Sequence, residues 1–252
     1  MTLQLRVATF NIRNSSAPDG DDSWPVRRGS TIAAIEALEA EVVGLQEVLP
    51  DQLDYLREAF AGWQIVGAGR DDGIHEGEHS VVLVRPGDWE VESDETRWLS
   101  PTPSDAGSVG WDADLTRIAT LVRLRHLDGT RVGVANTHYD HAGEVARVES
   151  SRLLAQWIAA EPSLHWILMG DLNATPDSPP LKALTSAGLL DAVPANEGGT
   201  EHAFTGATDR DRIDHILTDR SWKVIEAAVA HDRPGDRLPS DHWPVAATLQ
   251  LA

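Results

Sequence analysis

Three short polar motifs each adjoin an apolar, strand-like run, and their placement constrains the fold of this chain. Residues 170–173 (Gly-Asp-Leu-Asn) follow the run Trp-Ile-Leu-Met, and residues 212–215 (Arg-Ile-Asp-His) and 240–242 (Ser-Asp-His) lie beside further apolar runs. Asp171 and Asn173 are two positions apart, so in an extended chain they point the same way from the end of a buried strand. An α/β protein gathers a polar site in this manner at the edge of its sheet.

The chain also contains two similar strand–helix–strand segments. In the first, a strand over residues 3–10 ends at Asn11, a helix spans 26–39, and a strand over 42–46 ends at Glu47. In the second, a strand over 132–137 ends at His138, a helix spans 144–160, and the strand 166–169 leads into Asp171. Both have the length of one strand–helix–strand unit, about 30 residues or more.

Further strands are predicted over residues 81–84, 90–99 and 118–124. The repeated arrangement predicts an α/β fold with two sheets packed face to face and helices on the outer faces. The strand ends then converge on one edge and bring the polar motifs together.

Length and composition favour one domain over residues 1–252. The chain is 41% hydrophobic, and it shows neither a low-complexity linker nor a repeat. It has no run of about 18 apolar residues, so we expect no membrane association, and its start does not resemble a leader, so we expect a cytoplasmic protein. With no cysteine in the chain, disulfides, thiolate zinc sites and a cysteine nucleophile are excluded.

The net charge of −19 restricts the substrates. Affinity for nucleic acid comes largely from lysines and arginines that neutralise phosphates, and this surface would repel a long polyanion. Long duplex DNA is therefore a poor candidate substrate.

The residue types at the strand ends indicate a site for a hard divalent cation. Carboxylate and amide oxygens suit Mg²⁺ or Mn²⁺, whereas zinc is bound mainly by histidine and cysteine. We expect Asn11, Glu47 and Asp241 to be the oxygen donors. Asp171 would then orient or deprotonate an attacking water, and His242 would donate to a phosphoryl oxygen if Asp214 fixes its ring.

The same motifs in the same order resemble the endonuclease/exonuclease/phosphatase superfamily, which has the DNase I-like fold. The matching segments are residues 9–13 (Thr-Phe-Asn-Ile-Arg), 45–48 (Leu-Gln-Glu-Val), 136–141 (Asn-Thr-His-Tyr-Asp-His), 170–176 (Gly-Asp-Leu-Asn-Ala-Thr-Pro), 212–215 and 240–245 (Ser-Asp-His-Trp-Pro-Val). The resemblance implies a four-layer α/β sandwich and divalent-metal-dependent hydrolysis of phosphate esters.

The resemblance also implies roles for individual residues. It places Glu47 and Asn11 at the metal, Asp171 at the water and Asn173 at the phosphate. Asp214 and His242 correspond to the acid–histidine pair, and Asp241 to the acid linked to the metal. His138 corresponds to a second histidine that faces a glutamate, for which Glu78 is the candidate, and Arg117 resembles an arginine that contacts the phosphate.

Arg13 departs from the family pattern, because several DNA-repair relatives carry an acid there. This departure disfavours a two-metal site of their kind. The closest overall resemblance is to a bacterial branch with incompletely assigned functions, so no substrate is transferred from the family.

Tryptophans beside the motif loops are candidates to contact the substrate. Trp98, Trp111 and Trp243 lie in or next to those loops, and an aromatic face can stack on a base or a sugar. Trp157 and Trp166 are expected in the core.

We therefore predict a magnesium-dependent phosphoesterase that acts on a phosphate-ester substrate such as a nucleotide or a short nucleic acid, with a phosphodiester preferred over a monoester. The alternatives are a lipid head-group or inositol phosphate phosphatase, and a binding module that keeps the fold without catalysis.

Overall fold

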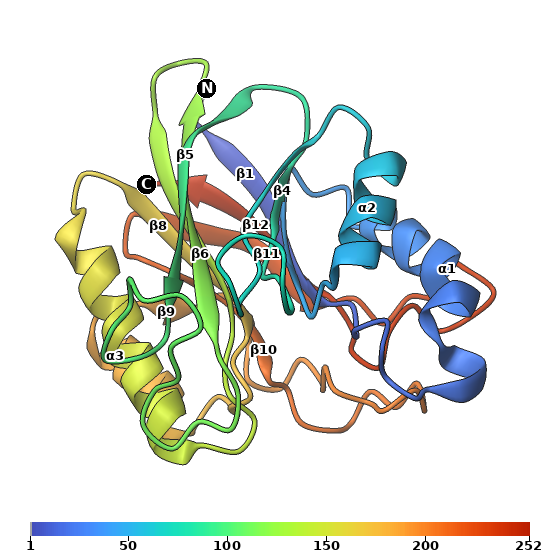
Figure 1. Cartoon of the computed structure of the whole chain (residues 1–252). Helices are drawn as coiled ribbons and strands as arrows, with labels where there is room; N and C mark the ends of the chain where they lie inside the picture. The colour runs from blue at the N-terminus through green and yellow to red at the C-terminus, as the bar shows by residue number, and fades with distance from the viewer. Residues whose placement is uncertain (1) are drawn as a thin grey trace.

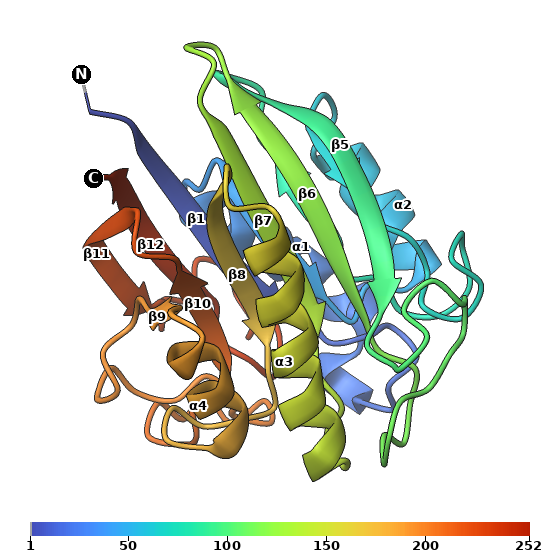
Figure 2. The same cartoon turned by 90° about the vertical axis from the view of Figure 1, so that its left-hand side faces the viewer.

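Two six-stranded sheets pack face to face, and helices cover their outer faces (Figure 1). The computed structural model describes residues 2–252. Figure 1 shows α1 and α2 on one flank and α3 on the other, with both sheets between them, and Figure 2 shows α3 and α4 in front of the second sheet. This is the four-layer α/β sandwich, as expected.

The first sheet has the strand order β11-β12-β1-β2-β4-β3, and the second has the order β5-β6-β7-β8-β10-β9. The strands are β1 (Gln4–Asn11), β2 (Val42–Gln46), β3 (Gln64–Val66), β4 (Val82–Val84), β5 (Trp89–Trp98), β6 (Ile118–His126), β7 (Arg131–His138), β8 (His165–Asp171), β9 (Leu190–Asp191), β10 (Asp214–Thr218), β11 (Trp222–Val229) and β12 (Val245–Leu251). The helices are α1 (Trp24–Ala37), α2 (Pro50–Ala59), α3 (Glu144–Ala160) and α4 (Pro179–Ser186), with a 3-10 turn η1 (Gly20–Asp22).

Each sheet is built around one parallel strand pair whose crossover is a helix. β1 and β2 are parallel and are connected through α1, and β7 and β8 are parallel and are connected through α3. These are the two strand–helix–strand segments predicted from the sequence, and the remaining neighbours in both sheets are antiparallel. Within residues 2–252, no helix combines the length and the apolar character needed to span a membrane.

Three apolar clusters fill the spaces between the layers. Leu5, Val7, Val134 and Ile167 belong to the cluster between the sheets. A second cluster joins β1, β2 and β4 to α1 and α2, and a third joins the second sheet to α3 and α4. Burial at this scale, worth roughly 25 cal/mol per Å² of apolar area, fixes the distance between the sheets and hence the strand ends.

A buried asparagine links the two sheets directly beneath the polar edge. The Asn136 side chain donates to the carbonyl oxygens of Leu45 (2.9 Å) and Val81 (2.8 Å) and accepts a hydrogen bond from Gln46 (2.6 Å). Gly44 permits this approach, because a Cβ at that position would lie 2.7 Å from Asn136 Oδ1. Asn136 in β7 therefore holds the end of β2 against the second sheet.

The strand registers bring the predicted polar residues to one edge. Asp171 at the end of β8 lies between His138 of parallel β7 and Asp214 of antiparallel β10. Asn11 ends β1 opposite Gln46 of β2, and Glu47 follows directly. Asp241 and His242 precede β12, which pairs with β1.

Candidate active site

An acid–histidine pair forms the centre of the polar edge. His242 Nδ1 lies 2.8 Å from Asp214 Oδ2, and both side chains are buried. Burial disfavours the imidazolium, but the charge and hydrogen bond of Asp214 outweigh it and raise the pKa of His242 well above its ordinary value. The other ring nitrogen, Nε2, lies 3.9 Å from Asp171 Oδ2. His242 is therefore held as a proton or hydrogen-bond donor that points toward Asp171.

Asp171 is held by two hydrogen bonds. Asn11 Nδ2 donates to its Oδ2 at 3.0 Å, and the backbone N–H of Asn173 donates to its Oδ1 at 2.9 Å. Burial and the neighbouring Asp214 carboxylate raise the pKa of Asp171 to about 7. A carboxylate that is fixed in this way and has a pKa near neutrality suits the task of accepting a proton from water.

Glu47 is the most strongly hydrogen-bonded acid of the site. Its Oε1 accepts from Asn11 Nδ2 at 3.0 Å, and its Oε2 accepts from the backbone N–H (3.0 Å) and the amide (2.7 Å) of Asn14. Although burial opposes its charge, the nearby histidines, His138 first, and these hydrogen bonds keep the pKa of Glu47 below its usual range. The backbone is left-handed at Glu47 (φ 60°), a conformation that costs energy and turns the chain at the end of β2.

Asp241 lies beside an arginine instead of a further acid. Arg13 Nε is 3.6 Å from Asp241 Oδ2, and Arg13 also pairs with Asp19 at 3.1 Å. Burial raises the pKa of Asp241. Ser240 Oγ donates to the carbonyl of Asn11 at 2.7 Å and so joins the segment before β12 to the end of β1. The Arg13 side chain thus supplies positive charge beside Asp241.

The donor set fits a divalent cation. Asp171, Asp214 and His242 place ligand atoms within 4.8 Å of one another, and this trio differs from the predicted oxygen donors Asn11, Glu47 and Asp241, which lie at the same edge. Asp214 Oδ1 is buried and has no hydrogen-bond partner among residues 2–252. Burial raises the pKa values of Asp171 and Asp241, and repulsion from the neighbouring carboxylates of Asp214 and Glu47 adds to the shift. Bound Mg²⁺ or Mn²⁺ would relieve this repulsion.

The second histidine, His138, lies next to Asn173. Asn173 Nδ2 donates to the Tyr139 carbonyl at 2.9 Å and lies 3.2 Å from His138 Nε2. Burial and the charge of Arg117 lower the pKa of His138 well below its ordinary value, so the ring is neutral. Its Nε2 also lies 3.5 Å from Asp171 Oδ2, and its Nδ1 is buried with no hydrogen-bond partner among residues 2–252.

Glu78 bonds to arginines rather than to His138. Its Oε2 accepts from Arg70 Nη1 at 2.6 Å and lies 4.0 Å from Arg117 Nη1. Glu78, Arg117 and His138 line one small cavity of about 10 Å³, together with Arg70, Ser80 and Ile118. The residues predicted to face each other thus share a cavity, and Arg70 is an addition that the sequence did not single out.

The structure corrects the prediction for Trp243. This side chain is only 1% exposed, packs against the His202 and His231 rings, and donates its Nε1–H to the Ala207 carbonyl at 2.9 Å. Its apolar surface contributes to the core between the sheets, so it does not line a cleft. Trp98 is also buried, and its Nε1–H donates to the Arg70 carbonyl at 2.7 Å. Trp111 is 38% exposed in its loop.

Two residues that support the site, Asn14 and Arg27, are not marked by any sequence motif. Asn14 binds Glu47 but follows the recognisable motif as an ordinary polar residue. From the sequence alone, Arg27 in α1 would be expected to face solvent. In the structure its guanidinium is buried against the backbone near Asn11 and Asp241. No local pattern distinguishes it from Arg28, because its burial depends on how α1 packs.

His215 stabilises the loop that follows β8. Its Nε2 donates to the Ala174 carbonyl at 2.8 Å, next to Asn173, and its Nδ1 lies 2.9 Å from Asp191 Oδ2. Arg212 donates to the same Asp191 oxygen at 3.0 Å. The Arg-Ile-Asp-His motif therefore supplies one residue to the acid–histidine pair and two to a buried support of the loop after β8.

The fold and site define an α/β-sandwich protein with an acid–histidine centre at the converging strand ends. The chain belongs to the Endonuclease/Exonuclease/phosphatase family, whose model matches residues 8–242. Family members are hydrolases that act on phosphate esters.

Solved structures and a curated relative agree with this assignment. A family protein from Bacteroides thetaiotaomicron is 32% identical, with a TM-score of 0.93 and coverage of 100% of this chain and 99% of that one. A mannosyl-6-phosphatase from the same species is 33% identical, with a TM-score of 0.89 and coverage of 97% and 99%. A probable RNA exonuclease of Saccharomyces cerevisiae is 25% identical over 213 residues, which are 75% of this chain and 41% of that protein.

Proposed function

We propose that this protein is a divalent-metal-dependent phosphoesterase. The observation that carries the proposal is the buried Asp214–His242 pair, with a bond of 2.8 Å, whose free nitrogen points toward Asp171. A base and a donor are thus set side by side, with pKa values shifted in directions that suit them to those roles.

The residues support an in-line attack of water on phosphorus. Asp171 accepts the water proton as the new P–O bond forms, His242 Nε2 donates a hydrogen bond to a non-bridging phosphoryl oxygen as charge develops there, and the leaving alkoxide takes a proton from solvent as the old P–O bond breaks. Asp214 stabilises the imidazolium and fixes its orientation. Asn173 orients Asp171 through its N–H, and the neutral His138 lies against the Asn173 amide.

Asn11, Glu47 and Asp241 would hold the metal, with Mg²⁺ the first candidate and Mn²⁺ the second. When bound, the metal neutralises charge on the phosphate and helps to orient it. Arg117 and Arg70 place further positive charge beside His138, and Glu78 neutralises part of that charge.

Metal binding should be visible without any substrate. We expect Mg²⁺ to raise the Tm of the wild type, because a ligand that binds only the folded state stabilises it by mass action. Glu47→Gln keeps the side-chain shape but removes a charge, and it should lose most of that rise in differential scanning fluorimetry. Glu58→Gln on the exposed side of α2 is the matched control and should respond like the wild type. Equal metal responses in all three proteins would contradict the ligand assignment.

Two substrate classes fit the catalytic centre. The phosphodiester predicted from the sequence agrees with the nuclease-like motifs and with the exonuclease relative. The mannosyl-6-phosphatase relative favours a phosphomonoester of a sugar, because it is more similar to this chain (33% against 25%) and is matched over 99% of its length, whereas the exonuclease is matched over 41%. We therefore place the sugar phosphomonoester first, a revision of the sequence-based order.

A direct comparison of substrates tests this order. With Mg²⁺ present, we expect kcat/KM for mannose 6-phosphate and p-nitrophenyl phosphate to exceed that for bis-(p-nitrophenyl) phosphate by about tenfold or more, and chelator to abolish hydrolysis of all three. Faster diester cleavage would restore the phosphodiesterase assignment. Failure to hydrolyse any ester with either metal would favour the binding-module alternative.

A further inference from the structure

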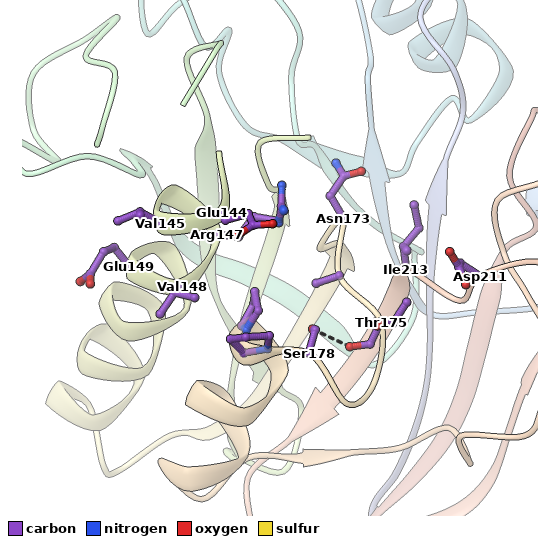
Figure 3. Close-up of a pocket in the computed structure, with 13 residues that line it drawn as sticks. Glu144, Val145, Arg147, Val148, Glu149, Asn173, Thr175, Ser178, Asp211 and Ile213 are labelled. Carbon is purple, nitrogen blue, oxygen red and sulfur yellow. Dashed lines mark hydrogen bonds between the residues drawn. The ribbon is translucent and has the colours of Figure 1, made fainter. Parts of the chain in front are cut away.

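A cavity of about 660 Å³ lies beside the catalytic residues and is assigned to no step of the reaction (Figure 3). Its walls come from the first turns of α3 and α4, the segment after β8 and the segment before β10. The volume falls within the range of small-molecule sites, roughly 300–1,000 Å³. It is large enough for the organic part of a phosphate ester.

Asn173 connects this cavity to the catalytic centre. Its side chain lines the cavity, and its backbone N–H binds the Asp171 carboxylate at 2.9 Å. Ile213, another lining residue, directly precedes Asp214. A phosphate at Asp171 and His242 therefore has its ester substituent within reach of the cavity.

The helix N-termini at this cavity disfavour the binding of a second phosphate. Helix N-termini commonly bind anions through free backbone N–H groups, and two of them face this cavity. In α3 the N–H groups of Val145 (3.2 Å) and Ala146 (2.7 Å) already donate to the Asp112 carboxylate. In α4 the first two residues are Pro179 and Pro180, which have no N–H to offer.

The charged side chains that line the cavity also disfavour a second phosphate. The acids are Glu144, Glu149 and Asp211, and Arg147 is the basic residue among the lining positions. Arg147 Nη1 donates to the backbone carbonyls of Asp140 and His141, both at 2.9 Å, and its single positive charge is outnumbered by the three acids. Carboxylates accept hydrogen bonds, so this wall suits a group that carries O–H donors and no negative charge.

The lining also disfavours a nucleobase. Recognition of bases usually includes stacking on an aromatic ring, and the thirteen described residues that line the cavity include no aromatic one. They instead include apolar side chains such as Val148 and Ile213, which suit the C–H faces of a sugar or polyol. Ser178 and Thr175 add polar atoms, and the Ser178 hydroxyl donates to the Thr175 carbonyl at 2.6 Å (Figure 3).

We infer that this cavity is the subsite for the leaving alcohol and that it selects a neutral, hydroxyl-rich group, a sugar or polyol with a single phosphate. The inference rests on the proposed function and adds its specificity determinant. The phosphate binds at the strand ends, the polyol occupies the cavity, and the acidic wall rejects substrates with a second phosphate there.

The test uses the full chain and a variant that fills the cavity. Val148→Phe adds a ring to a half-buried lining position of α3, and Val26→Phe makes the same change on the exposed face of α1. We expect Val148→Phe to lower kcat/KM for mannose 6-phosphate about tenfold or more and to leave the Ki of inorganic phosphate unchanged. Val26→Phe should match the wild type in both. In the wild type, adenosine 5′-monophosphate and fructose 1,6-bisphosphate should each be poorer substrates by a similar factor.

Binding of free mannose separates this inference from the proposed function. Saturation-transfer NMR should detect mannose on the wild type and on Val26→Phe but not on Val148→Phe. Ester hydrolysis that is unchanged by Val148→Phe, or no preference for the hexose monophosphate, would overturn the subsite while leaving the phosphoesterase intact. Mannose binding without hydrolysis of any ester would instead overturn the phosphoesterase and retain the subsite.

Discussion

Asp171→Asn should lower kcat for phosphate ester hydrolysis by about a thousandfold or more, because it removes the base while keeping the shape of the side chain. The fold should tolerate the change. Burial and Asp214 make the charge of Asp171 unfavourable, as its raised pKa shows, so a neutral amide relieves repulsion while one of the two hydrogen bonds remains. We expect a Tm in chelator close to that of the wild type.

Asp219→Asn is the matched control for this variant. Asp219 accepts a hydrogen bond from the backbone N–H of Trp166 at the opposite end of β8 and lies far from the polar edge. The same substitution there should leave kcat within about twofold of the wild-type value. Activity of Asp171→Asn at the wild-type level would refute the role of Asp171 as the base.

Arg27→Met should destabilise the protein by about 3 kcal/mol or more, which corresponds to a fall in Tm of about 6–12 °C. The buried guanidinium donates to four backbone carbonyls, those of Ile12 (2.7 Å), Arg13 (2.7 Å), Asp22 (2.9 Å) and Pro239 (2.9 Å). Burial lowers its pKa to about 10, so it stays charged at neutral pH. Methionine fills the space but leaves the Ile12 and Asp22 carbonyls without a donor, while the Pro239 carbonyl keeps Thr31 Oγ1 (2.6 Å) and the Arg13 carbonyl keeps Gln52 Nε2 (3.0 Å).

Arg28→Met provides the comparison for Arg27. Arg28 is the next residue of α1, is exposed, and stacks its guanidinium 4.7 Å from the centre of the Tyr55 ring. Its replacement should cost less than about 1 kcal/mol. Equal losses of Tm in the two variants would show that the carbonyl contacts of Arg27 contribute little. Because Arg27 joins the segments after Asn11 and before Asp241, its variant should also lose activity at temperatures where it remains folded.

The central part of the fold follows from sequence patterns, and its periphery depends on packing. The strand over 42–46 and the helix over 144–160 have the predicted bounds, because a run of apolar residues or a helical periodicity defines each one. Helices α2 and α4 were not predicted. Each is short and begins with proline, and each is stabilised mainly by the sheet face that it covers.

In the candidate site too, some positions follow from sequence patterns and others depend on packing. The convergence of Asp171, Asp214 and His242 could be predicted because each lies at or next to the end of a strand whose register the fold determines. The position of Trp243 could not be predicted, because the sequence does not distinguish a loop tryptophan that faces solvent from one that packs against two histidine rings, as this one does. The cavity beside Asn173 depends on how the first turns of α3 and α4 approach each other, which no local pattern specifies.

Hydrolysis in ¹⁸O-labelled water tests the central claim most directly. Wild-type protein, Mg²⁺ and mannose 6-phosphate should yield inorganic phosphate that carries one ¹⁸O atom and mannose that carries none at the released hydroxyl, as measured by mass spectrometry. Chelator and Asp171→Asn should each abolish this labelled product. Label in the released sugar hydroxyl, or labelled phosphate formed equally well by Asp171→Asn, would contradict attack on phosphorus by a water that Asp171 activates.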